Sequence, residues 1–113
     1  MSNLESLDKA GFEAAAGEPG VMVVDFWAGW CGPCKAMAPN FERAAQLRPL
    51  YRFAKVDVDA EPALAGAYGV QSIPTLLVLR DGKPVAAHSG VVGAEQLVEA
   101  IDRVVGEPVA SGS

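Results

Sequence analysis

The residues of this chain with the clearest chemistry are two cysteines separated by only two positions. Cys31 and Cys34 are the only cysteines among 113 residues, and a glycine and a proline lie between them. A disulfide stabilises a fold mainly by restricting the unfolded chain, and a ring this small contributes only about 2 kcal/mol, against about 3 kcal/mol for a 15-residue loop. The pair is therefore a poor structural crosslink, and its spacing favours a disulfide that opens and closes.

The segment around the cysteines predicts where they lie in the fold. The nearly continuous apolar run Val21–Ala28 is typical of a strand covered on both faces, and Cys31–Leu47 has the apolar spacing of a helix that Pro39 should kink. At the start of a helix, unpaired backbone N–H groups and the helix dipole favour the thiolate of Cys31, which is the nucleophilic form. Cys34 follows one turn later on the same face, where it would lie deeper and resolve a mixed disulfide.

The residues inside the pair and the number of available ligands favour redox chemistry over metal binding. Gly32 lets the backbone of a substrate come close, and Pro33 suits the first helical turn, where its missing N–H would have no partner. The alternative is half of a zinc site, but zinc normally takes four ligands, and His88 is the only histidine in the chain. We therefore predict no metal at this pair.

A carboxylate inside the apolar run is the second candidate for chemistry. Asp25 faces a buried environment, where desolvation should raise the pKa of its carboxyl. It lies nine residues before Cys34, on the strand that leads into the helix, and could take and return the proton of that thiol. Alternatively, Asp25 is a solvated edge residue or a cap. Lys55, in the next strand of the sequence, either tunes this acid or is an ordinary surface lysine.

The remaining pattern predicts alternating strands and helices of one α/β domain. The further elements are a short edge strand Leu4–Leu7, a helix from Asp8 to Gly17, a strand Arg52–Val58, a helix Pro62–Tyr68, a strand Thr75–Leu79, a hairpin turn at Asp81–Gly82, a strand Pro84–Ser89 and a last helix with Leu97, Val98, Ile101, Val104 and Val105 on one face. This order implies right-handed crossovers and a parallel core sheet, to which the terminal hairpin adds an antiparallel edge, with helices on both faces. The predicted domain covers residues 1–106, and residues 107–113 form a loose tail.

Charge and hydropathy argue against several classes of function. The net charge is −5 with no basic stripe, so nucleic-acid binding is not expected. No stretch approaches the roughly 20 apolar residues that span a bilayer. The first residues lack a secretion signal, which predicts a cytoplasmic protein without membrane association. The sequence is silent on oligomeric state, and a monomer is the default expectation.

The same residues resemble the active site of the thioredoxin family. The segment Trp27–Lys35 (WAGWCGPCK) matches that family, and the resemblance runs in one register from about Leu7 to Val105. Its further matches are Asp25, Pro39, Lys55, Val56–Asp59, Ser72–Thr75, Asp81–Gly82 and Gly90. Ser89 stands where that family more often has an apolar residue, a difference that would alter contacts with substrates.

This resemblance implies a fold, a site and partners. The fold would be α/β, with a central five-stranded mixed sheet flanked by four helices. Pro74 would be cis and pack against the cysteines, although pattern alone argues against a cis bond, which only about 5–6% of X–Pro bonds adopt. The surface that receives substrate proteins would consist of Trp30, Gly32, Pro33, Ile73, Pro74 and Gly90. Electrons would come from thioredoxin reductase, an NADPH-dependent flavoenzyme, and this chain would bind no cofactor.

The predicted function is protein-disulfide reduction by dithiol–disulfide exchange, with electrons donated to disulfide-containing target proteins. Cys31 would be the nucleophile and Cys34 the resolving thiol, and Asp25 would handle the proton. A second hypothesis is a binding module whose flat surface clamps a partner while the thiols are incidental. A third is an oxidant or isomerase outside the cytosol, against which the Gly32–Pro33 dipeptide and the missing export signal both argue.

Overall fold

Five strands and four helices alternate along residues 3–106, the part of the chain that the computed structural model describes. In chain order they are β1 (Leu4–Ser6), α1 (Lys9–Ala16), β2 (Val21–Trp27), α2 (Gly32–Leu47), β3 (Arg52–Asp57), α3 (Pro62–Ala67), β4 (Thr75–Arg80), β5 (Lys83–Ser89) and α4 (Ala94–Val105). Wherever the sequence predicted both ends of an element, the observed ends agree to within one residue. The predicted tail, residues 107–113, lies outside the described residues.

The sheet is mixed, and its antiparallel part begins in the middle of the sheet. The strand order is β1-β3-β2-β4-β5, in which β1, β3 and β2 run parallel, β4 runs antiparallel to β2, and β5 antiparallel to β4. The sequence predicted a parallel core to which the terminal hairpin adds an antiparallel edge, and the parallel strands β1, β3 and β2 beside the β4–β5 hairpin confirm this. The chain re-enters the sheet at the end it left, with β3 ending beside Trp27 and β4 beginning beside Phe26.

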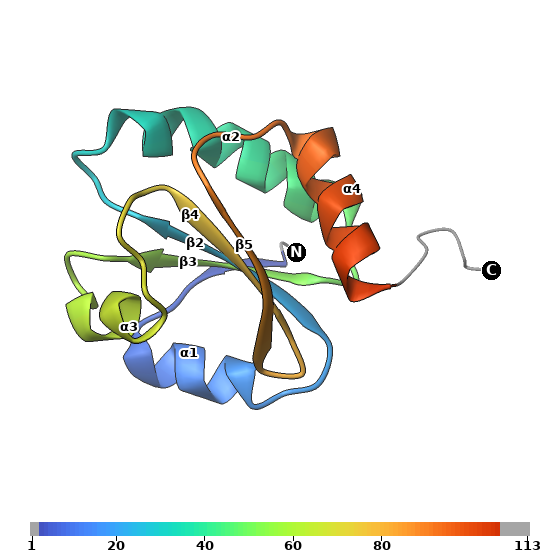
Figure 1. Cartoon of the computed structure of the whole chain (residues 1–113), viewed down its shortest axis with the longest axis horizontal. Coiled ribbons are helices and arrows are strands. Elements are labelled where there is room, and N and C mark those ends of the chain that lie inside the picture. Colours follow the sequence, from blue (N-terminus) through green and yellow to red (C-terminus); the bar gives the residue numbers. More distant parts are fainter. Residues whose placement is uncertain (1–2, 107–113) are drawn as a thin grey trace.

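Strand β2 is covered on both faces, which explains its nearly continuous apolar sequence. Figure 1 shows α2 and α4 on one face of the sheet and α1 and α3 on the other. All of β2 except Trp27 is buried. Val23 packs in a cluster with residues of α2 and α4, whereas Val24 packs in a cluster with residues of α1 and α3. Because side chains alternate along a strand, Asp25 lies on the same face as Val23, under α2 and α4.

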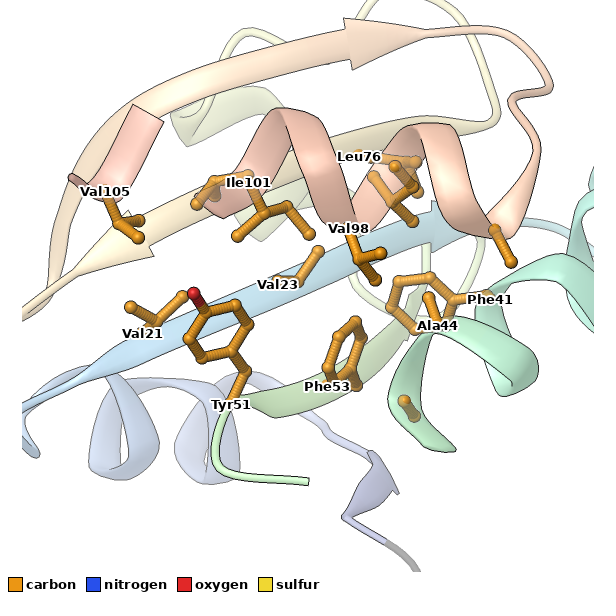
Figure 2. Packing of buried hydrophobic residues seen from close by; sticks show 14 of the residues in the cluster. Val21, Val23, Phe41, Ala44, Tyr51, Phe53, Leu76, Val98, Ile101 and Val105 are labelled. Atoms are coloured by element: carbon orange, nitrogen blue, oxygen red, sulfur yellow. The ribbon is translucent and has the colours of Figure 1, made fainter. Parts of the chain in front are cut away.

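The core beneath α2 and α4 is built around two aromatic rings (Figure 2). Phe41 of α2 and Phe53 of β3 meet edge to face, with ring centroids 5.4 Å apart and an interplanar angle of 74°. Val98 of α4 and Val23 of β2 belong to the same buried cluster. Burial of these rings fixes α2 against the sheet, and with it the position of the helix start that carries the cysteines.

The apolar face of α4 is narrower than the sequence predicted. Its buried members are Ala94, Leu97, Val98, Ile101 and Val105. Val104, which was expected on the same face, is 44% exposed. Neighbouring residues of a helix are turned by about 100°, so the burial of Val105 carries Val104 to the margin of the stripe.

Local sequence signals define the ends of the elements as expected. Asp8 is the N-cap of α1, and its side chain accepts a hydrogen bond from the backbone N–H of Gly11 at 2.8 Å. The β4–β5 hairpin turns at Asp81 and Gly82, which have φ angles of 53° and 82°. A Cβ on Gly82 would overlap the carbonyl oxygen of Ala16, so this turn requires glycine for both conformation and space.

Candidate redox site

The two cysteines lie at the junction between β2 and α2, at the start of the longest helix. Cys31 is the N-cap of α2, with an extended backbone (φ −88°, ψ 113°), and Pro33 falls in the first turn as predicted. The backbone N–H of Cys34 donates to the Sγ atom of Cys31 at 3.2 Å. The two residues are joined in a disulfide, with Cα atoms 5.2 Å apart. The N-terminus of α2 therefore points at the sulfur of Cys31, an arrangement that favours its thiolate once the disulfide is reduced.

Both cysteines are nearly enclosed, and depth hardly distinguishes them in the disulfide form. Cys31 is 4% exposed and Cys34 is 3% exposed, and both pack in one cluster with Ala28. The sequence predicted that Cys34 would lie deeper than Cys31. The difference is small because the bond holds the sulfurs together, so that each covers the other. What separates the two residues is their place in the helix: Cys31 precedes the first turn, and Cys34 lies inside it.

The loop before β4 lies against Cys31. The Ile73–Pro74 peptide bond is cis, as the resemblance implied and as pattern alone did not predict. The carbonyl oxygen of Ile73 lies 3.7 Å from the Sγ atom of Cys31. The carbonyl oxygen of Pro74 in turn accepts a hydrogen bond from the backbone N–H of Gly90 at 2.9 Å. Segments that are far apart in the sequence thus meet at the cysteine pair.

Trp30 stands out from the surface directly before Cys31. Its side chain is 69% exposed, and its indole N–H donates to Oδ2 of Asp59 at 2.8 Å. The backbone N–H of Asp59 donates to Oδ1 of Asp57 at 2.9 Å. Sequence reasoning missed the contact of Asp59, because no local pattern links it to a tryptophan 29 positions earlier. Asp59 restrains the indole ring beside the disulfide.

A small pocket of about 200 Å³ lies beside the disulfide. Its lining residues come from the Trp30 turn, the end of β3, α3 and the cis-proline loop: Trp30, Val58, Ala65, Val70, Gln71, Ser72 and Ile73. The lining is mostly apolar, with two polar residues, Gln71 and Ser72, both exposed. A pocket of this size and lining is suited to an apolar side chain of a docked polypeptide.

Asp25 is fully buried and its carboxylate has no hydrogen-bond partner within the described residues. Burial raises the pKa of this carboxyl to about 6, and the positive charge of Lys55 partly opposes the shift. Lys55 lies opposite Asp25 in the β2–β3 register, and its Nζ lies 4.9 Å from the centroid of a Trp27 ring. The structure therefore brings Asp25 and Lys55 together on neighbouring strands, and a buried carboxyl with a pKa near neutrality can exchange protons.

Three other residues considered for the site lie in two places: Gly32 and Pro33 lie between the cysteines, and His88 lies on β5. Gly32 and Pro33 are exposed at the start of α2. His88 is exposed on β5. Among residues 3–106, no group of three or more His, Cys, Asp or Glu side chains is arranged to hold a metal ion. Within the same residues, no helix has the length and apolar character needed to cross a bilayer.

Comparison with known proteins places this geometry among established relatives. The family model described as Thioredoxin matches residues 3–103. A thioredoxin from Staphylococcus aureus is 48% identical over 87 residues, which cover 76% of this chain and 84% of the relative. The solved structure of Fasciola hepatica thioredoxin superposes with a TM-score of 0.81 at 39% identity, covering 88% of this chain and 98% of that one. The structure of Malassezia sympodialis thioredoxin gives a TM-score of 0.82 at 30% identity, with 92% of each chain covered.

A cysteine pair of this spacing at the start of α2, on this sheet, makes the protein a thiol–disulfide oxidoreductase. The family match and the identity to curated relatives assign it further: the chain belongs to the thioredoxin family. Its activity is dithiol–disulfide exchange, by which it reduces disulfides of target proteins. At the level of the family, its partners are disulfide-containing targets and a reductase.

Proposed function

We propose that Cys31 is the nucleophile and Cys34 the resolving thiol of this exchange. The observation that carries the proposal is the position of Cys31 as N-cap of α2, with the backbone N–H of Cys34 3.2 Å from its sulfur. In the reduced protein this N–H and the helix dipole stabilise negative charge on the sulfur of residue 31. Cys34 lies within bonding reach of Cys31, so it can act as soon as a mixed disulfide has formed.

The exchange proceeds in two balanced steps. The Cys31 thiolate attacks one sulfur of the target disulfide, a Cys31–target disulfide forms, and the other target sulfur leaves as a thiolate. The Cys34 thiolate then attacks the sulfur of Cys31, which forms the Cys31–Cys34 disulfide and releases the second target thiolate. Two electrons pass to the target, and the protein is left oxidised.

Asp25, with Lys55 beside it, supplies the proton acceptor for the second step. Cys34 must lose its proton before it attacks, and Asp25 lies on the sheet face that α2 covers, buried and without a partner. Its pKa of about 6 makes the carboxylate available as a base near neutral pH, while it can still return the proton. The charge of Lys55 keeps this pKa from rising further.

The docking surface for target proteins consists of Trp30, Gly32, Pro33, Ile73, Pro74 and Gly90. Supporting this proposal, Trp30 projects into solvent, Gly32 and Pro33 are exposed, and the carbonyl groups of Ile73 and Pro74 contact Cys31 and Gly90. An exposed indole ring next to the exposed Gly32 and Pro33 is suited to contact a polypeptide that carries the disulfide. The pocket beside Trp30 would take one of its apolar side chains.

The wider setting of the activity also belongs to this proposal. Thioredoxin reductase, the NADPH-dependent flavoenzyme that serves this family, would reduce the Cys31–Cys34 disulfide again, and the chain itself would hold no cofactor. The protein would act as a monomer in the cytoplasm, with residues 1–106 as its functional domain.

The roles of the two cysteines are separable by single substitutions. Cys31→Ser should abolish the acceleration by this protein of insulin reduction with dithiothreitol, measured as turbidity, because the serine hydroxyl cannot form the mixed disulfide. Cys34→Ser should instead accumulate a covalent target adduct, visible on a non-reducing gel and released by dithiothreitol. Circular dichroism of both variants controls for folding. Wild-type turbidity rates in Cys31→Ser, or adducts that form at residue 34 in preference to residue 31, would overturn the assignment.

A further inference from the structure

The segment between β5 and α4, residues 90–93, is held at two points and presents an apolar side chain between them. At its start, the backbone N–H of Gly90 donates to the carbonyl oxygen of Pro74 at 2.9 Å. At its end, the carbonyl oxygen of Gly93 accepts the first hydrogen bond of α4, from Leu97 at 2.9 Å. Between these points Val91 is 47% exposed. Through Gly90 and Pro74 this segment, the rim segment, is bonded to the loop that contacts Cys31.

Val92, the next residue, has both of its backbone polar groups bonded to side chains of α2. Its N–H donates to the Sδ atom of Met37 at 3.4 Å, and its carbonyl oxygen accepts from the side-chain amide of Asn40 at 3.0 Å. Met37 and Asn40 are three residues apart on one helix and therefore share a face. Met37 is fully buried, Asn40 is half-buried, and the side chain of Val92 packs against the core beneath α2 and α4.

We infer that Asn40 and Met37 are positioning residues for target docking, because they fix Val92 and thereby the exposed Val91 of the segment that is bonded to the cis-proline loop. The inference rests on the proposed docking surface and extends it. The helix that carries the redox cysteines at its start holds the rim segment one to two turns further along. One helix, α2, therefore carries both the nucleophile and the side chains that hold the rim segment, which fixes the distance between them. A loop held only by its own backbone would be more mobile.

The test separates docking from chemistry by comparing a protein substrate with a small one. In Asn40→Leu, which removes the amide donor at similar size, we expect the half-saturating insulin concentration to rise about five-fold, the effect of losing one hydrogen bond. The limiting rate of insulin reduction and the rate with glutathione disulfide should stay unchanged, because neither depends on the rim. Amide hydrogen exchange at Val92 should become faster. Met37→Leu, a volume-conserving change that removes the sulfur acceptor, should act in the same direction.

Asn3 offers a matched control at the other end of the molecule. Its side-chain amide also donates to backbone carbonyl oxygens, those of Arg48 at 3.2 Å and Tyr51 at 2.9 Å. Asn3→Leu should therefore lower the stability without changing the insulin half-saturation. An unchanged insulin half-saturation in both Asn40→Leu and Met37→Leu would overturn the inference, as would equal slowing with insulin and glutathione disulfide. Trp30→Ala distinguishes failure of this inference from failure of the proposed docking surface. If Trp30→Ala also leaves the half-saturating insulin concentration unchanged, the proposed docking surface is wrong.

Discussion

Each end of the molecule contains one carboxyl group whose pKa is shifted, and the two shifts have opposite directions. At the cysteine end, Asp25 is fully buried with no hydrogen-bond partner among the described residues, and burial raises its pKa to about 6. At the far end of α2, Asp102 of α4 accepts hydrogen bonds from the Arg48 guanidinium at 2.6 to 3.1 Å and from the Tyr51 hydroxyl at 2.7 Å. Burial alone would raise the pKa of Asp102, but these two partners outweigh it and lower the pKa.

The contacts of Asp102 stabilise the folded state, whereas ionised Asp25 destabilises it. The Arg48–Asp102 pair joins the C-terminus of α2 to α4, and the side chains are 21% and 12% exposed, so solvent screens it little. Asp25, in contrast, destabilises the folded state whenever it is ionised, because nothing replaces the water that its carboxylate loses. A group that is costly in this way persists where its chemistry is used, which supports the proposed role of Asp25 as a proton acceptor.

The largest change in stability is expected at the far end. Asp102→Ala leaves the Arg48 guanidinium and the Tyr51 hydroxyl without their shared partner and should lower the free energy of unfolding by about 4 kcal/mol near pH 7. Because the folded pKa of Asp102 is lowered, its contribution is present above the ordinary value of 3.8 and disappears as the pH falls through the folded pKa. Urea unfolding measures the effect, and insulin reduction should be unchanged.

Glu95→Ala is the control for that prediction, since Glu95 forms an exposed ion pair with Arg43 at 3.9 Å. A pair in solvent contributes little, so this variant should unfold like the wild type. An Asp102→Ala variant as stable as Glu95→Ala would remove the contrast between the two ends.

At the cysteine end, removal of the Asp25 charge should increase the stability of the fold, whereas removal of Asp102 decreases it. The folded pKa of Asp25 is raised from 3.8 to about 6, so wild-type stability is highest below the unfolded value and falls as the pH rises through about 6. Relative to the wild type, Asp25→Asn should therefore gain about 2.4 kcal/mol between pH 4 and pH 8. The stability difference between variant and wild type is measured at both pH values, and subtracting one difference from the other removes any pH-independent effect of the new amide. The variant should also resolve the mixed disulfide more slowly. A stability difference that does not change with pH would contradict the buried, ionisable Asp25.

The smallest effect is expected from the charge beside Asp25. Lys55→Met removes the positive charge that opposes the upward shift, so the pKa of Asp25 should rise above about 6. Stability would still begin to fall near the unfolded value of 3.8, but the pH at which the fall ends would move upward with the folded pKa. Lys35→Met, at the exposed start of α2, is the matched control and should leave this pH unchanged. A downward shift in Lys55→Met would show that Lys55 acts through its contact with Trp27 and not through its charge.

Much of the fold could be predicted because it follows from local patterns. Asp8 and the Asp81–Gly82 turn define element ends by their own backbone chemistry, and the observed bounds agree closely with the predicted ones. The order of the strands could not be predicted this way, because the position of β2 between β3 and β4 depends on how the elements pack. The exposure of Val104 was missed for a similar reason: the width of the apolar face depends on what α4 packs against.

By itself, the sequence determined the chemistry: a cysteine pair at a strand-to-helix junction, a carboxylate in a buried strand and a turn that requires glycine. These follow from residue type and near neighbours, whose interactions act over a few positions of the chain. Only the tertiary structure decided which distant groups meet these residues: Asp59 on Trp30, the Ile73 carbonyl on Cys31, and Asn40 on Val92. Such contacts join residues 29 to 52 positions apart, and they depend on how the strands and helices pack, which no local pattern encodes.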